Sequence, residues 1–141
     1  MILELDIGNS RIKWRELGPR EATGQIQYCA SLIELEIALE ASKERYRACR
    51  VCLVRSAQEA RAAVEAILRP HVTGKLCFAV SSGALAGVKS LYFDPRQLGI
   101  DRWLAVVAGY NETLGPSIIV DAGTAITADF VDGSGKHLGG M

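Results

Sequence analysis

The sequence has 141 residues, of which 49% are hydrophobic, and its 16 basic and 16 acidic side chains leave no net charge. This composition is typical of an ordered globular protein, and the charge balance argues against electrostatic binding to nucleic acid. No apolar run reaches the length of a membrane span, and the acidic start excludes a signal peptide, so we predict a cytoplasmic protein.

The first predicted element is a strand, a polar turn and a second strand over residues 2–14. Apolar residues alternate along the first strand, which places them on one face, and Asp6 lies on the other face just before the turn. Gly8 and Asn9 tolerate positive φ, so we predict a two-residue hairpin turn there.

The residues of this turn suit a phosphate-binding loop. The hydroxyl of Ser10 and the cation of Lys13 follow Asp6, and a Gly-containing turn offers backbone N–H groups to phosphate oxygens. Because a carboxylate repels phosphate, Asp6 implies a bridging Mg²⁺ or water. On these residues alone the signal is weak, because a polar hairpin with one Asp is far more often an ordinary turn.

The same pattern recurs over residues 117–131, where an apolar strand leads into Asp121-Ala-Gly-Thr124 and a second strand. The two copies lie about 115 residues apart, which is too far for a solenoid repeat. The separation fits two related domains that close on one nucleotide. We therefore predict a first domain over residues 1–116 and the beginning of a second over residues 117–141.

Strands and helices alternate between the two copies. The predicted strands cover residues 21–28, 49–54 and 75–80, and the predicted helices begin at Ser31 and Ser56. Each of these serines is followed three residues later by Glu, which is a capping box, and Pro70 ends the second helix. This order predicts an α/β sheet with helices on its faces and ligands beyond the strand ends.

The four cysteines are interpreted as buried structural thiols. Cys49 and Cys52 have the spacing of a metal or redox pair, but positions three apart in a strand face opposite sides. No histidine or second cysteine pair lies near them in the sequence. The full set is Cys29, Cys49, Cys52 and Cys77.

Residues 92–103 form a second informative stretch. Asp94-Pro95 suits the start of a turn, and Gly99 separates it from a helix predicted over residues 100–113. Asp101 and Arg102 fall in the first turn of that helix. Asp101 there complements the helix dipole, so a solvated pair without further function is an open interpretation. The helix is apolar on most faces, which predicts that it is buried.

After residue 131 the sequence turns and begins another strand at residues 136–138. No helix follows to close this second sheet, so we expect a fragment, or strands that pack on the first domain or on a partner. His137 is predicted to be an ordinary strand residue, with a place in the nucleotide cleft as the alternative. His71 follows Pro70 in a connection and is predicted to be solvated.

Taken in order, these motifs resemble the type III pantothenate kinase family. The matching residues are Asp6-x-Gly-Asn-Ser10 with Lys13-Trp14, Tyr92, Gly99-Ile-Asp-Arg102, Asp121-x-Gly-Thr124 and His137-Leu-Gly-Gly140. The two Asp-x-Gly turns identify only the superfamily of actin, chaperone ATPases and sugar kinases, whereas the Gly-x-Asp-Arg segment points to the family. The resemblance covers the whole chain and implies an α/β, actin-like ATPase (ribonuclease H-like) domain with the start of a second.

The resemblance also implies a reaction, the transfer of the γ-phosphoryl group of ATP to the primary hydroxyl of pantothenate. This gives 4'-phosphopantothenate, the first step of coenzyme A biosynthesis. It implies Mg²⁺ and a monovalent cation, K⁺ or NH₄⁺, and a homodimer with no nucleic-acid or membrane partner. Members of the family continue well past a Gly-Gly such as Gly139-Gly140, so the chain corresponds to an N-terminal half, and whether this half turns over is left open.

Carried onto this sequence, the resemblance assigns Asp101 as the base that accepts the hydroxyl proton. The implied pantothenate-binding residues are Tyr92, Gly99, Ile100 and Arg102. The implied ATP-binding residues are Asp6, Gly8, Asn9, Ser10, Lys13 and Thr124, with Asp6 acting through Mg²⁺ or water. Asp121 is implied to bind the monovalent cation. These roles are chemically reasonable, because phosphoryl transfer depends on positioning and charge neutralisation.

Two other classes of protein remain as alternatives. A non-catalytic transcriptional regulator similar to the same family is disfavoured by the neutral charge, by the lack of a helix-turn-helix pattern and by the Asp101-Arg102 pair. An ATP-binding structural protein of the actin or chaperone type is disfavoured by the short connections and the Gly-x-Asp-Arg segment.

Overall fold

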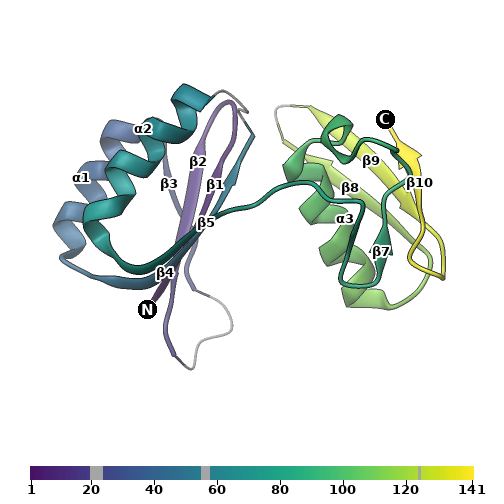
Figure 1. Ribbon diagram of the computed structural model, residues 1–141, viewed down its shortest axis with the longest axis horizontal. Coiled ribbons are helices and arrows are strands. Elements are labelled where there is room, and N and C mark those ends of the chain that lie inside the picture. The colour runs from purple at the N-terminus through teal and green to yellow at the C-terminus, as the bar shows by residue number, and fades with distance from the viewer. Residues whose placement is uncertain (20–23, 55–57, 124) are drawn as a thin grey trace. The chain divides into compact units, whose positions relative to one another are not determined.

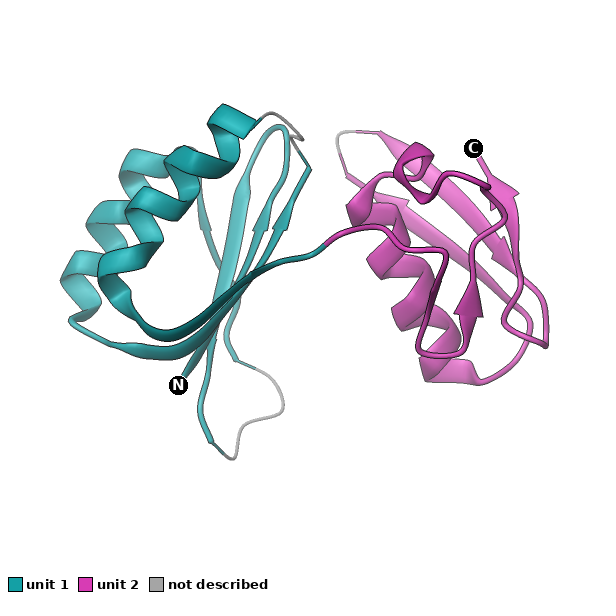
Figure 2. Cartoon of the chain, in the orientation of Figure 1, with its two compact units in different colours: residues 1–79 teal, residues 80–141 magenta. Residues whose placement is uncertain are grey.

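The computed structural model describes residues 1–19, 24–54, 58–123 and 125–141. These residues form two compact α/β units, Met1–Ala79 and Val80–Met141 (Figure 2), and each is described by itself. The boundary predicted at residues 116 and 117 falls inside the second unit, because the helix before it packs on the strands after it. Whether residue 117 begins a domain related to the first stays a prediction.

The first unit is a five-stranded mixed sheet with two helices. Its elements are β1 Ile2–Ile7, β2 Ile12–Leu17, β3 Gln27–Cys29, α1 Leu32–Ser42, β4 Tyr46–Leu53, α2 Gln58–Leu68, a 3₁₀ turn Arg69–His71 and β5 Val72–Phe78. The strand order is β3-β2-β1-β4-β5 (Figure 1), with β1, β4 and β5 parallel to one another and β2 antiparallel to its neighbours β1 and β3.

Most local predictions for this unit are confirmed, with shifted strand ends. Ser31 caps α1 by accepting a hydrogen bond from Glu34 N at 3.2 Å, and the Glu34 carboxylate accepts one from Ala30 N at 3.0 Å. The helix α2 ends two residues before Pro70 as expected, and Ser56 lies outside the described residues. The strand expected over residues 21–28 begins in part outside the described residues, and within them it covers Gln27–Cys29. Both later strands begin three residues earlier than expected.

The two faces of this sheet differ in chemistry, and this explains where the helices lie. Leu3 and Leu5 of β1 are buried on the face covered by α1 and α2. On the other face, the Glu4 carboxylate binds Arg15 of β2 at 2.6 Å and Arg50 of β4 at 3.1 Å. Burying such charges under a helix is costly, so both helices cover the same face (Figure 1) rather than one on each.

Two predictions about single side chains need correction. His71 is not solvated but 6% exposed, because the 3₁₀ turn joins α2 directly to β5 and leaves no exposed loop for it. The prediction of buried thiols is confirmed for Cys49, whose burial raises the pKa of the thiol to about 12. Cys29, Cys52 and Cys77 are half-buried instead.

The second unit is a three-stranded antiparallel sheet with one long helix packed on it. Its elements are β6 Ala84–Leu85, β7 Val88–Lys89, a 3₁₀ turn Pro95–Gln97, α3 Ile100–Thr113, β8 Ser117–Ala122, β9 Ile126–Val131 and β10 His137–Gly140. The predicted helix agrees with α3, which packs on β8 and β9 of the sheet β10-β9-β8. The strands are thus closed by a helix that precedes them. Trp103 and Val106 are buried, whereas Leu104 and Val107 are only half-buried, so α3 is buried on one side.

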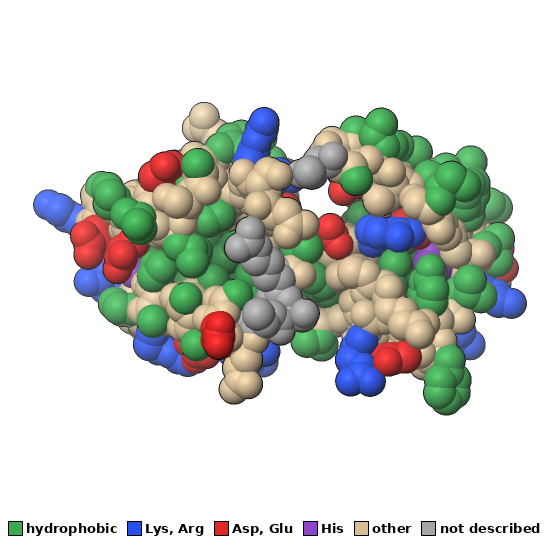
Figure 3. Space-filling model, turned by 90° about the horizontal axis from the view of Figure 1, so that it is seen from above, with side chains coloured by type: hydrophobic (Ala, Val, Ile, Leu, Met, Phe, Trp, Pro, Cys, Tyr) green, Lys and Arg blue, Asp and Glu red, His purple; other side chains and the backbone are tan. Residues whose placement is uncertain are grey.

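The face of this sheet that α3 does not cover is apolar and exposed. Ile118, Val120 and Ile126 are all more than 60% exposed. On the face of the molecule drawn in Figure 3, basic and acidic side chains are interspersed over both units. Among the described residues, no helix is long and apolar enough to cross a membrane.

The core of the first unit can be tested at Leu39, whose side chain is fully buried in α1. We expect Leu39→Ala to lower the free energy of unfolding of this unit by about 2–5 kcal/mol. Ile37 on the same helix is 61% exposed, so Ile37→Ala should change it by only about 0.5 kcal/mol. Each unit holds one tryptophan, so Trp14 fluorescence in a Trp103→Phe background reports on the first unit alone. Equal losses for both variants would contradict the assigned core.

A second test concerns the backbone of the second unit at Gly135, which has φ +82°. A Cβ there would lie 2.1 Å from the Gly87 carbonyl oxygen, so Gly135→Ala should lower the free energy of unfolding by more than about 2 kcal/mol. Gly133→Ala is the matched control, since its Cβ would meet only the Pro116 side chain at an ordinary 3.5 Å. Trp103 fluorescence in a Trp14→Phe background measures both. A stable Gly135→Ala variant would refute the close approach of these two loops.

Candidate functional site

The turn between β1 and β2 is a four-residue loop. Strand pairing ends at Ile7 and Ile12, and Gly8 N donates a hydrogen bond to Arg11 O at 3.0 Å. The predicted two-residue hairpin is therefore wrong. Neither Gly8 nor Asn9 has a positive φ, because a longer loop closes without left-handed residues.

Asp6 and Lys13 face each other across the two strands at the mouth of this loop. The Asp6 Oδ2 atom lies 3.4 Å from Lys13 Nζ, and both side chains are about half exposed. Asn9 and Ser10 are exposed in the loop itself. Mg²⁺ keeps several of its waters and is bound through one or two carboxylates plus substrate phosphates, so an exposed Asp6 fits a hydrated Mg²⁺. The Lys13 ammonium and the loop backbone are suited to phosphate oxygens.

The second Asp-x-Gly turn lies in the other unit and is one residue shorter than the first. The strands β8 and β9 pair up to Ala122 and Ile126, and Gly123 N donates to Ala125 O at 3.0 Å. Asp121 lies near the end of β8, exposed, as an oxygen ligand for a cation would be. Thr124 lies outside the described residues.

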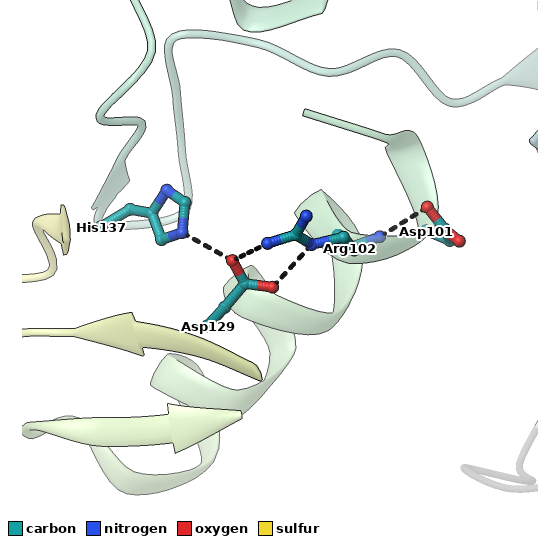
Figure 4. Close-up of polar contacts among 4 residues, drawn as sticks. All are labelled: Asp101, Arg102, Asp129 and His137. Atoms are coloured by element: carbon teal, nitrogen blue, oxygen red, sulfur yellow. Dashed lines mark hydrogen bonds and ion pairs between the residues drawn. The ribbon is translucent and has the colours of Figure 1, made fainter. Parts of the chain in front are cut away.

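The beginning of α3 arranges Asp101 and Arg102 in the first turn, as predicted. Asp101 Oδ1 accepts a hydrogen bond from Arg102 N at 2.8 Å (Figure 4). Gly99 precedes the helix, and a Cβ at that position would lie 2.7 Å from Asp101 Oδ1. Glycine at position 99 therefore leaves the space into which the Asp101 carboxylate folds back.

The Arg102 guanidinium forms a two-pronged ion pair with Asp129 of β9. Nε lies 2.9 Å from Asp129 Oδ2 and Nη2 lies 2.7 Å from Oδ1 (Figure 4). Asp129 is 2% exposed and the Arg102 side chain 23%. This geometry excludes the interpretation of Arg102 as a merely solvated neighbour.

His137 completes the group from β10. Its Nε2 atom lies 2.9 Å from Asp129 Oδ1, its side chain is fully buried, and its ring centroid is 6.0 Å from that of Tyr92. It is a strand residue, as predicted. Its side chain is nevertheless specialised, because it contributes to holding a buried carboxylate. The structure thus brings Tyr92, Asp101 and Arg102 into one unit with His137, which the sequence motifs include, and with Asp129, which sequence reasoning missed.

A signal for Asp129 was present in the sequence. Thr127, Asp129 and Val131 are two residues apart along β9 and therefore share one face of the strand. This is the face that packs against α3, so an acidic residue falls on it. A carboxylate on a buried face requires a partner, but nothing local in the sequence says which of the 16 basic residues supplies it.

The charges in this group are strongly coupled. Burial of the Asp129 carboxyl raises its pKa, but hydrogen bonds from Arg102 and His137 outweigh burial and hold that pKa below its usual value. The hydrogen-bonded Asp129 carboxylate in turn raises the pKa of Arg102. Both groups are therefore charged at neutral pH.

We expect Asp129→Asn to lower the free energy of unfolding of the second unit by about 1–3 kcal/mol at pH 7, since one charged partner is lost. The pKa of the Asp129 carboxyl is lower in the folded chain than in the unfolded chain, where it is about 4. The stabilisation from the carboxylate is therefore complete above the unfolded-state pKa and is lost as the pH falls through the folded-state pKa. The gap between wild type and variant should therefore be present at neutral pH and shrink in acid, as the Asp129 carboxylate is protonated. Urea unfolding followed by Trp103 fluorescence in the Trp14→Phe background measures it. Asp94→Asn, in the solvent-exposed pair with Arg96, should cost less, and an equal loss would show that the Asp129 pair has no special weight.

Comparisons with known proteins agree with these motifs. The type III pantothenate kinase family matches residues 2–141. Type III pantothenate kinases of Ectopseudomonas mendocina, Azotobacter vinelandii and Pseudomonas syringae pv. syringae are 42%, 39% and 41% identical over the whole chain. The chain spans 57% of the length of each. A solved Ppx/GppA phosphatase from Aquifex aeolicus is 12% identical to this chain, with a TM-score of 0.46. The match covers 99% of this chain and 50% of the phosphatase chain. On the family match and these three relatives, the chain belongs to the type III pantothenate kinase family.

Proposed function

We propose that this chain carries the catalytic and phosphate-binding residues of a pantothenate kinase. The reaction transfers the γ-phosphoryl group of ATP to the primary hydroxyl of pantothenate, at the start of coenzyme A biosynthesis. The observation that carries the proposal is the Asp101-Arg102 pair at the start of α3, with the guanidinium held in a fixed orientation, in a chain of this family. None of the three relatives named above is called a transcriptional regulator.

Asp101 is the base in this proposal. One of its oxygens accepts the Arg102 N–H, and the other oxygen is directed away from that bond (Figure 4). Because the transition state of phosphoryl transfer is loose, the carboxylate need only orient the hydroxyl in line with the γ-phosphorus and take its proton late. Fixing Asp101 through the backbone serves that purpose.

Pantothenate is held, in this proposal, at the same end of α3. Its carboxylate is drawn to the Arg102 guanidinium and to the positive end of the helix dipole, beside Gly99 and Ile100. Tyr92 lies against the ring of His137 and lines the same region.

The nucleotide belongs to the Asp-x-Gly turns. We propose that Lys13 and the loop backbone bind ATP phosphates. We also propose that Asp6 would hold Mg²⁺ through water, and that the ion would neutralise part of the phosphate charge. Thr124 is proposed as a further phosphate ligand and Asp121 as a ligand of K⁺ or NH₄⁺.

The larger assembly is also a proposal. The repetition of strand, Asp-containing turn and strand in the two units supports an actin-like (ribonuclease H-like) domain and the beginning of a second one. The exposed apolar face of β8 and β9 would then pack against further polypeptide, in line with relatives longer than this chain. We propose a homodimer that works in the cytoplasm.

The test is pantothenate-dependent release of ADP by this chain, measured with K⁺ and with Na⁺. We expect release that requires pantothenate and K⁺, and a fall of about 10²–10⁴-fold in Asp101→Asn, since the variant cannot take the proton. Glu112→Gln, an exposed position on the same helix, is the matched control and should keep full activity.

Two results would count against the proposal. ADP release that persists without pantothenate, or equally in Asp101→Asn, would contradict the assigned reaction and base. No release by the wild-type chain would refute the claim that the residues present here suffice for turnover.

A further inference from the structure

We infer that Asp129, supported by His137, is a positioning residue that fixes which edge of the Arg102 guanidinium meets the substrate carboxylate. The inference rests on the proposed function, because it concerns how the same site recognises pantothenate. It assigns a role to His137-Leu-Gly-Gly140, the one motif of the chain for which the proposed reaction gives no use.

The first step is the geometry of the guanidinium. Its five N–H groups point outward in one plane, and Asp129 accepts from Nε and from one hydrogen of Nη2. The edge formed by Nη1 and the second Nη2 hydrogen lies at the other end of the group. Among the described residues, no hydrogen bond from Nη1 is seen, and the Arg102 side chain is 23% exposed. One complete fork therefore remains for a second carboxylate.

The second step is what holds Asp129 itself. Its Oδ1 atom accepts from Arg102 Nη2 and also lies 2.9 Å from His137 Nε2. An ionised carboxylate can only accept, so His137 carries its proton on Nε2 and donates it. Because the imidazole is fully buried and lies beside Tyr92, the carboxylate is prevented from turning about its own axis.

The third step is the backbone of β10. A Cβ at Gly140 would lie 2.3 Å from Asp129 Oδ1, 2.8 Å from Arg102 Nη2 and 2.2 Å from the Ala128 carbonyl oxygen. Only glycine lets the strand approach so closely. The same strand thus supplies the imidazole that holds Asp129 and the flat surface against which the ion pair lies.

The consequence is a site that selects a carboxylate by the geometry of its hydrogen bonds more than by long-range electrostatic attraction. Arg102 and Asp129 together carry no net charge, so their long-range pull on an anion is weak. A carboxylate that meets the free fork still gains two parallel hydrogen bonds, which a point charge such as lysine cannot supply. Loss of Asp129 leaves the charge of Arg102 in place but frees the guanidinium to rotate.

The test compares two ligands by calorimetric binding and by steady-state kinetics. One ligand is pantothenate and the other is the neutral amide made from its carboxyl group. We expect Asp129→Asn to raise the Kd and KM for pantothenate about 10–100-fold with little change in kcat, as loss of hydrogen bonds to a charged group implies. The amide, which has no carboxylate to align, should change less than about twofold.

A pair of substitutions at His137 provides a second readout if Asp129→Asn proves unstable. His137→Gln keeps an N–H donor near the position of Nε2 and should retain most of the pantothenate affinity, whereas His137→Leu removes the donor and should lose it. In the wild type, ¹⁵N NMR should show His137 as the Nε2–H tautomer. The chain has only two histidines, so this signal is readily assigned.

The outcomes separate the two proposals. If the wild type binds neither ligand and turns over neither, the proposed function fails and this inference fails with it. If the wild type binds pantothenate but Asp129→Asn binds it equally well, or weakens both ligands in proportion, the function stands and the positioning role is refuted.

Discussion

The central polar contact of the second unit is the ion pair between Arg102 and the buried carboxylate of Asp129. It joins the first turn of α3 to the middle of β9, and through His137 it extends to β10. Removing a carboxylate from water costs several kcal/mol, and an apolar pair of similar shape would hold a helix on a sheet as well or better. Stability alone therefore does not explain why charged groups occupy this position. A fixed direction for a guanidinium does, since packing of apolar side chains cannot aim hydrogen-bond donors.

In the first unit, two carboxylates on one strand differ in their surroundings. Glu4 and Asp6 lie on the same face of β1, two residues apart. The Glu4 carboxylate is bound by arginines on both neighbouring strands, so it serves the sheet. Asp6 lies at the strand end, where Lys13 Nζ is 3.4 Å from its Oδ2 atom and its side chain is 43% exposed. Position along one strand thus decides which carboxylate is structural and which is exposed to solvent and to cations.

The sequence predicted what local rules control and missed what distant partners decide. The cap at Ser31, the alternation along β1 and the start of α3 depend on residues within one turn or one strand, and these predictions are confirmed. The ion pair joins residues 27 positions apart, so only the folded chain identifies Asp129 as the partner. His71 was misjudged for a similar reason, because a 3₁₀ turn rather than an open loop followed α2. The roles assigned by resemblance at the two Asp-x-Gly turns stay predictions.

The carboxylates of Asp101 and Asp129 each lie close to a glycine, but they differ in how their oxygens are hydrogen-bonded. This difference makes Asp101 better suited than Asp129 to accept a proton. Gly99 leaves space for Asp101 Oδ1 and Gly140 for Asp129 Oδ1, so backbone proximity places both carboxylates. Asp129 has both oxygens engaged by charged or N–H donors, which holds its pKa low and leaves it a poor acceptor. Asp101 is half-buried and has one oxygen on a backbone N–H, so its other oxygen remains for a substrate hydroxyl. In the proposed reaction the two adjacent residues therefore act differently: Asp129 fixes the orientation of Arg102, and Asp101 is the proposed base.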